Sequence, residues 1–142
     1  RVIDSQSQFF PGTEHIMGWD MTNSGFKVLL SADIAALAQS QVRPGMEDFL
    51  GRHGLAIPDI DHWLVHPGGP KVIRALEEGL GLPAHALALS WESLAEAGNI
   101  SSASVLQVLD TFMEREQPEP GDVGMLMAMG PAFSAELVLL QW

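Results

Sequence analysis

Apolar and polar residues follow one another along this chain in patterns that predict both strands and helices. Residues 2–10 mix Val, Ile and Phe with Ser and Gln, as a strand does. Two more apolar runs, 16–19 and 26–30, are joined by Thr22-Asn23-Ser24-Gly25. Because Asn and Gly tolerate positive φ, this stretch predicts a hairpin.

Helical spacing begins after Ser31, which we expect to cap a helix starting near Ala32. Apolar residues then recur every three to four positions as far as Leu50. Pro44 interrupts this pattern and predicts a break or a kink, because proline removes a helical hydrogen bond.

Three further helices are predicted later in the chain. One follows Pro70 and ends near Gly79 to Gly81, and a second runs from a cap at Ser90 to about Ala97. The third covers 101–116 and is expected to turn six apolar side chains inward: Val105, Leu106, Val108, Leu109, Phe112 and Met113.

Strands are predicted at 60–65, 123–129 and 133–140. Together with the hairpin and the helices they predict a layered α/β fold, a mixed sheet packed with helices, formed by residues 1–142 as one domain. The chain starts at Arg1 in strand-like sequence without a Met, so we expect it to be a piece of a longer polypeptide.

Composition limits the chemistry. The chain has no Cys, which excludes disulfides, thiolate metal ligands and a cysteine nucleophile within it. Its formal net charge of −11 argues against nucleic acid as a partner, since phosphate binding needs a basic surface. No apolar run is long enough to span a membrane, and we expect a soluble, cytoplasmic protein without a metal.

The candidate chemistry lies in two stretches. His66 follows the strand 60–65 and enters a Pro-Gly-Gly turn, where an imidazole can act as acid, base or hydrogen-bond donor. Asn99, in Gly98-Asn99-Ile100-Ser101, offers a neutral amide for a developing oxyanion. The alternatives are a histidine that only hydrogen-bonds its turn and an asparagine that only caps a helix.

Three motifs, taken together, resemble the carboxyl-terminal half of type III polyketide synthases, the chalcone and stilbene synthase-like enzymes of the thiolase fold. They are Val65-His66-Pro67-Gly68-Gly69-Pro70, Gly98-Asn99-Ile100-Ser101-Ser102-Ala103-Ser104 and Met129-Gly130-Pro131-Ala132-Phe133. The family's Gly-Phe-Gly-Pro-Gly loop reads Ala128-Met129-Gly130-Pro131-Ala132 here, so two glycines are replaced by alanine.

The resemblance implies a Cys-His-Asn site that works on CoA thioesters without a further cofactor. The cysteine would come from a missing amino-terminal half, and the enzyme would be a homodimer that takes an acyl-CoA starter and malonyl-CoA. His66 would keep the cysteine ionised, and together with Asn99 it would stabilise the enolate left when malonyl-CoA loses carbon dioxide. Pyrone, resorcinol or naphthalene-type products would follow.

Other positions carry over from the same resemblance. Ser101, Gly130 and Pro131 would line the acyl cavity and its neighbouring loop, and the region of Phe26 and Val28 would supply a gatekeeper side chain. Lys71, at the start of a helix, can meet a CoA phosphate or simply be solvated. Two alternatives remain: a ketoacyl synthase III-like condensing enzyme of fatty acid synthesis, and a non-catalytic scaffold or dimerisation domain of the same fold.

Overall fold

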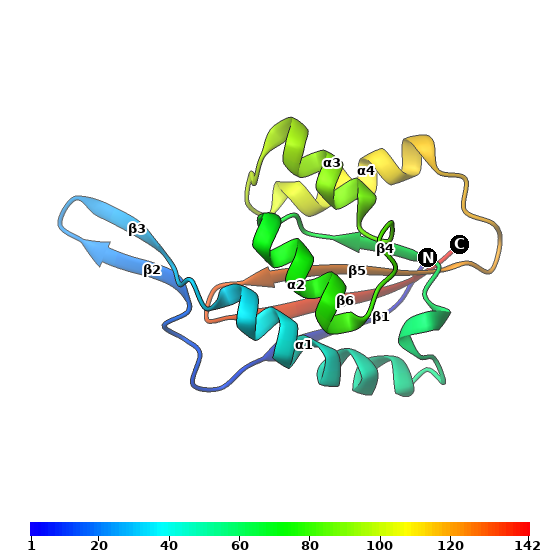
Figure 1. Ribbon diagram of the computed structural model, residues 1–142, viewed down its shortest axis with the longest axis horizontal. Coiled ribbons are helices and arrows are strands. Elements are labelled where there is room, and N and C mark those ends of the chain that lie inside the picture. The colour runs from blue at the N-terminus through cyan, green and yellow to red at the C-terminus, as the bar shows by residue number, and fades with distance from the viewer.

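The computed structural model describes residues 1–142 and consists of a mixed sheet, covering helices and a separate hairpin (Figure 1). The strands are β1 (Val2–Phe9), β2 (Met17–Thr22), β3 (Gly25–Leu30), β4 (His62–Val65), β5 (Val123–Gly130) and β6 (Ser134–Gln141). The α-helices are α1 (Ile34–Gly51), α2 (Pro70–Leu80), α3 (Ala88–Ala97) and α4 (Ala103–Arg115), and a 3₁₀ turn, η1, spans Ile57–Asp59.

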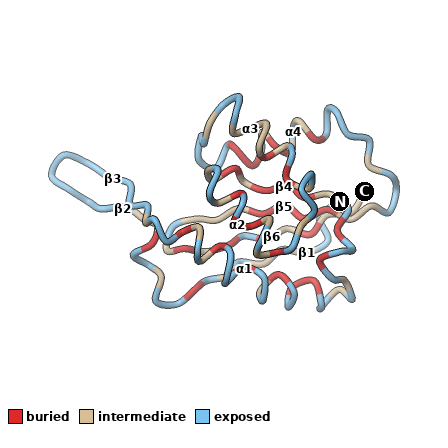
Figure 2. Tube along the Cα trace, viewed as in Figure 1, coloured by how far each residue is buried: buried red, intermediate tan, exposed pale blue.

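The main sheet has the strand order β1-β6-β5-β4. β4 runs parallel to β5, whereas β5–β6 and β6–β1 are antiparallel. A short parallel pair at one edge of an otherwise antiparallel sheet puts the carboxyl end of β4 beside the β5–β6 turn. β2 and β3 form their own two-stranded hairpin, which projects beyond the body of the molecule and is largely exposed (Figures 1 and 2).

Each face of the sheet has its own apolar layer. Side chains of α1 and α2, such as Met46 and Leu76, form one core with Trp63, Val65 and Met127 of the sheet. On the other face, alternate strand residues pack against α4 in a smaller cluster built on Leu64, Val108 and Phe112. Period-two alternation along β4 therefore divides its side chains between two cores, and His62 and His66 belong to the α4 face.

The predicted mixed α/β architecture and the hairpin are confirmed, and five details are wrong. α1 begins at Ile34 with Asp33 at its N-cap position, so Ser31 does not cap it. β4 begins at His62, two residues later than expected. α1 continues through Pro44, so the predicted break is absent: the proline is exposed, while Val42 and Met46 on either side are fully buried.

The other two details concern helix surfaces. Ser90 does not cap α3 but lies within its first turn, fully buried. On α4 the inward set is smaller than expected, since Leu106 and Met113 are 61% and 55% exposed. No helix in the structure combines the length and apolarity needed to cross a bilayer.

Candidate active site at the carboxyl end of β4

The backbone of His66 is fixed on both sides as the chain leaves β4. Its N–H donates to the carbonyl of Met127 on β5 at 2.8 Å, and its own carbonyl accepts the N–H of Gly68 at 2.9 Å. Gly69 then takes φ +150°, a conformation that L side chains rarely adopt, and α2 begins at Pro70. The Pro-Gly-Gly sequence thus turns the chain directly from strand into helix and leaves the imidazole at the sheet edge.

The imidazole of His66 is half-buried, and one of its ring nitrogens lacks a hydrogen-bond partner. Its Nδ1 is buried and has no partner. Burial also lowers the pKa of His66 below its ordinary value of 6.5, because desolvation disfavours the charged ring. A neutral ring carries one proton, and placing it on Nε2 avoids a buried N–H without an acceptor. His66 is therefore suited to donate a hydrogen bond through Nε2.

Asn99 lies in the loop between α3 and α4 and is held by both ends of its amide. Its Nδ2 donates to the carbonyl of Gly68 at 3.1 Å, and its Oδ1 accepts the N–H of Ser101 at 2.9 Å. Ser101 adopts φ +64°, the left-handed region, which is uncommon for a residue other than glycine. The amide nitrogen carries a second proton that remains available to a ligand.

Gly68 joins the two predicted catalytic residues. Its N–H binds the carbonyl of His66, and its carbonyl binds the side chain of Asn99. The structure therefore brings His66 and Asn99, separated by 33 positions, to one turn. A neutral imidazole and a neutral amide carried by one turn are the types of donor that stabilise an enolate or a tetrahedral oxyanion.

The β5–β6 turn forms a further wall at the same end of the sheet. Gly130 pairs with Ser134, and Pro131 follows it in the turn. Ala132 and Phe133 both adopt positive φ, +62° and +47°. The N–H of Ala132 donates to the carbonyl of Met17 at 2.7 Å, which ties this turn to the base of the β2–β3 hairpin. Ala132 thus adopts a conformation that favours glycine, and the backbone strain costs about 1 kcal/mol.

The remaining predicted site residues lie further out. Ser101 is exposed beside Asn99, and Lys71 is exposed in the first turn of α2 without a hydrogen-bond partner in the structure. Phe26 and Val28 are 72% and 49% exposed on the projecting hairpin. Within this chain the structure does not bring these two side chains to His66.

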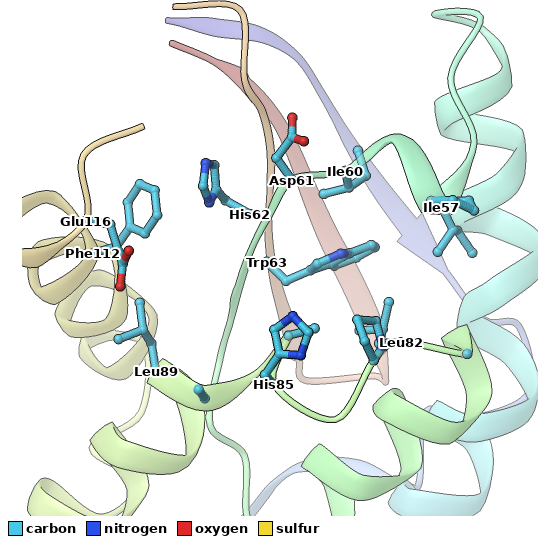
Figure 3. A pocket seen from close by; sticks show the side chains of 15 residues that line it. Ile57, Ile60, Asp61, His62, Trp63, Leu82, His85, Leu89, Phe112 and Glu116 are labelled. Atoms are coloured by element: carbon cyan, nitrogen blue, oxygen red, sulfur yellow. The ribbon is translucent and has the colours of Figure 1, made fainter. Parts of the chain in front are cut away.

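A well-defined pocket lies elsewhere. A pocket of about 480 Å³ opens at the amino end of β4, between η1, the α2–α3 connection and the end of α4 (Figure 3). His62, His85, Trp63 and Phe112 contribute rings to its lining. The pocket lies at the end of β4 opposite to His66. No group of three His, Asp or Glu side chains in the structure is arranged to hold a metal ion.

Two buried hydroxyls near the site were not predicted to have this role. Ser90 on α3 donates to the carbonyl of Val65 at 2.6 Å, and Ser104 on α4 accepts the N–H of Ile100 at 2.9 Å. Both side chains are fully buried. The available signal was a polar residue within an otherwise apolar helical surface, which the prediction of a cap at Ser90 did not use.

Known proteins match this chain over nearly its whole length. The sequence model described as "Chalcone and stilbene synthases, C-terminal domain" matches residues 1–142. A 1,3,6,8-tetrahydroxynaphthalene synthase from Streptomyces peucetius is 47% identical over 141 residues, which are 99% of this chain and 37% of that protein. A putative chalcone synthase from Bacillus subtilis is 38% identical over 142 residues, 100% of this chain and 39% of that protein.

The same relationship is seen among solved structures. The crystal structure of 1,3,6,8-tetrahydroxynaphthalene synthase from Streptomyces coelicolor, described as a bacterial type III polyketide synthase, superposes with a TM-score of 0.94 at 33% identity. It is matched over 100% of this chain and 40% of that chain. This chain therefore spans about two fifths of the length of these relatives, and the predicted thiolase-like fold is confirmed.

Proposed function

The chain belongs to the chalcone and stilbene synthases, as their C-terminal domain, and on that basis we propose that it supplies His66 and Asn99 to a type III polyketide synthase. The enzyme is an acyltransferase that extends an acyl-CoA starter with two-carbon units from malonyl-CoA. One observation carries the proposal: Gly68 hydrogen-bonds both predicted catalytic residues, so that an imidazole and an amide lie at one turn.

In the first step, a cysteine from another segment of the polypeptide attacks the starter thioester and releases CoA. The thiolate is the reactive form of cysteine, and the Nε2–H of an adjacent imidazole stabilises it by donating a hydrogen bond. Since this chain has no Cys, the 142 residues alone do not form the acyl-enzyme.

In the second step, malonyl-CoA loses carbon dioxide and the electrons of the broken C–C bond form an enolate. We place the enolate oxygen between the Asn99 amide and the His66 imidazole, where hydrogen bonds offset its charge. The enolate carbon then attacks the acyl thioester, a new C–C bond forms, and the cysteine leaves as a thiolate. Neutral donors suffice for this chemistry, so no metal or organic cofactor is part of the proposal.

The product class follows from the relatives rather than from the geometry of this chain. A 1,3,6,8-tetrahydroxynaphthalene synthase and an α-pyrone synthesis polyketide synthase-like protein from Mycobacterium tuberculosis are 47% and 35% identical to it. We therefore propose naphthalene, pyrone or resorcinol-type polyketides, with Ser101, Gly130 and Pro131 near the growing chain and with Phe26 or Val28 at its entrance.

Assembly and location complete the proposal. We propose a homodimer that acts in the cytoplasm, with Lys71 near a CoA phosphate. Exposed apolar side chains on the β2–β3 hairpin and on α4, such as Trp19, Met21 and Leu106, support burial of these surfaces against further protein. Light scattering of the full gene product measures the assembly directly.

The test is to incubate the full gene product with malonyl-CoA and acyl-CoAs of graded length and to read the product masses. We expect products heavier than the starter by successive two-carbon units, and none from residues 1–142 alone. Turnover by the isolated segment would contradict the proposed division of the site. Acyl transfer by the full product only from a carrier protein would favour a ketoacyl synthase, and absence of any condensation would favour a scaffold.

A further inference from the structure

We propose that Ser90 is a positioning residue for His66: its hydroxyl fixes the peptide unit that carries the histidine. The inference deepens the proposed function and rests on it, because His66 is the residue whose orientation matters. Ser90 lies on α3, far from His66 in sequence, and its side chain is fully buried on the face of the sheet that also holds α4.

The geometry concerns one peptide plane. The hydroxyl of Ser90 donates to the carbonyl of Val65 at 2.6 Å, while the N–H of His66 donates to Met127 at 2.8 Å. These carbonyl and N–H groups belong to the same planar peptide bond between Val65 and His66. The plane is therefore held from α3 on one side and from β5 on the other. Since the Gly68 N–H also binds the carbonyl of His66, both peptide units that flank the imidazole are fixed.

The position of β4 in the sheet explains why the Val65 carbonyl needs a side-chain hydrogen-bond donor. β4 is the edge strand of the sheet and pairs only with β5, so its other edge has no neighbouring strand. A carbonyl that is turned away from the paired strand at a buried edge needs another donor. Ser90 supplies this donor at the last residue of the strand, directly before His66.

Ser93 provides a matched control on the same helix. It lies almost one turn further along α3, is also buried, and its hydroxyl donates to the Gln107 side chain on α4 at 3.3 Å. Ser93→Ala therefore removes a buried hydroxyl from α3 and touches neither His66 nor Asn99. Ser90→Ala removes the bond to Val65, Ser90→Thr retains a hydroxyl at that place, and Ser90→Cys retains a weak donor.

The experiment uses the full gene product and two measurements. The first follows carbethoxylation of His66 by diethylpyrocarbonate across pH with peptide mass spectrometry, and the other four histidines of residues 1–142 serve as internal references. The second measures kcat and KM for malonyl-CoA consumption. For Ser90→Ala we expect the pH midpoint of His66 modification to move up toward its ordinary value, and kcat to fall about tenfold with KM unchanged, a smaller loss than a displacement of about 1 Å produces.

Partial recovery of both quantities in Ser90→Thr and wild-type behaviour in Ser93→Ala support the proposal. An unchanged midpoint in Ser90→Ala, or an equal shift in Ser93→Ala, overturns it. If Ser90→Ala does not fold, Ser90→Cys is read by the same criteria. Should the wild type consume no malonyl-CoA, the proposed function fails, and the carbethoxylation profile still decides whether Ser90 positions His66.

Discussion

His62 and His66 stand at the two ends of β4, on the same face of the sheet, and their surroundings are opposite. His62 hydrogen-bonds the carboxylate of Asp122 through Nε2 at 2.9 Å. Its ring packs on Phe112 and Trp142, with ring centroids 4.9 Å and 5.5 Å away. His66 has no side-chain partner at all, and its buried Nδ1 is unpaired. One imidazole is satisfied by its own protein, whereas the other remains available.

The difference shows that the described pocket and the proposed chemistry lie at opposite ends of β4. The cavity of about 480 Å³ lies beside the satisfied histidine (Figure 3). The available histidine lies at an open edge with a fixed backbone and an amide neighbour. A buried polar atom without a partner costs free energy, and this chain supplies no partner to Nδ1 of His66. The pair at His62 instead stabilises the fold.

The largest expected effect comes from removing the available imidazole. In His66→Gln we expect polyketide formation by the full gene product to fall by about 10²–10⁴-fold, the range for loss of a catalytic proton-transfer or hydrogen-bonding group. The melting temperature should not fall, because His66 forms no side-chain hydrogen bond that holds the fold together. Product assays and thermal unfolding measure the two quantities. A variant that melts earlier but turns over normally would reverse the roles assigned to the two histidines.

Loss of the amide should be nearly as severe. For Asn99→Ala we expect malonyl-CoA decarboxylation to fall by about 10²–10³-fold, as when one oxyanion-hole donor is removed. Loading of the starter onto the enzyme should continue, since Asn99 is assigned to the enolate only. Mass spectrometry of the acylated protein distinguishes the two steps. Equal loss of loading and decarboxylation would show that Asn99 acts instead by holding the loop.

At the other end of β4 the expected effect is on stability. Phe112 is 2% exposed and packs between His62 and Trp142. Phe112→Ala should lower the free energy of unfolding by about 3–5 kcal/mol, because it opens a cavity under the ring of His62. Denaturant unfolding gives this value, and assays below the transition should show normal turnover for the folded fraction. A catalytic defect larger than the folding defect would link this cluster to the active site.

The smallest effect is the pH dependence of the His62 pair. The hydrogen bond from His62, followed by one from the backbone of Glu119, lowers the pKa of Asp122 below its ordinary value of 3.8. A carboxyl whose pKa is depressed on folding contributes stability above its unfolded pKa and loses it as pH falls through the folded value. Wild type should therefore lose stability more steeply than Asp122→Asn below about pH 4. Parallel stability curves for the two proteins would show that the pair contributes nothing.

Sequence patterns predicted the helices and strands better than they predicted the long-range hydrogen bonds between them. The hairpin, the turn after His66 and the helix ending at Gly81 follow from local residues and are confirmed by the structure. The joint placement of His66 and Asn99 came from a family resemblance, because a hydrogen bond through Gly68 between residues 33 positions apart has no local signal. The assigned roles of both residues stay predictions.

The errors have one physical origin, which is tertiary packing. Pro44 is tolerated inside α1 because the buried residues around it hold both halves of the helix to one core. Ser90 has the residue type of a helix cap, but the unpaired edge of β4 offers its hydroxyl a buried acceptor. Leu106 and Met113 fit the helical period and are nevertheless exposed, since α4 packs on the sheet over a narrower surface than the period suggests.

The central claim is that His66 and Asn99 act as one site, and a double-mutant cycle on malonyl-CoA decarboxylation by the full gene product tests it most directly. Residues that act as a unit give strongly non-additive losses. We therefore predict that His66→Gln combined with Asn99→Ala decarboxylates at about the rate of the slower single variant. Losses that multiply in the double variant would show two independent contributions and would contradict the claim.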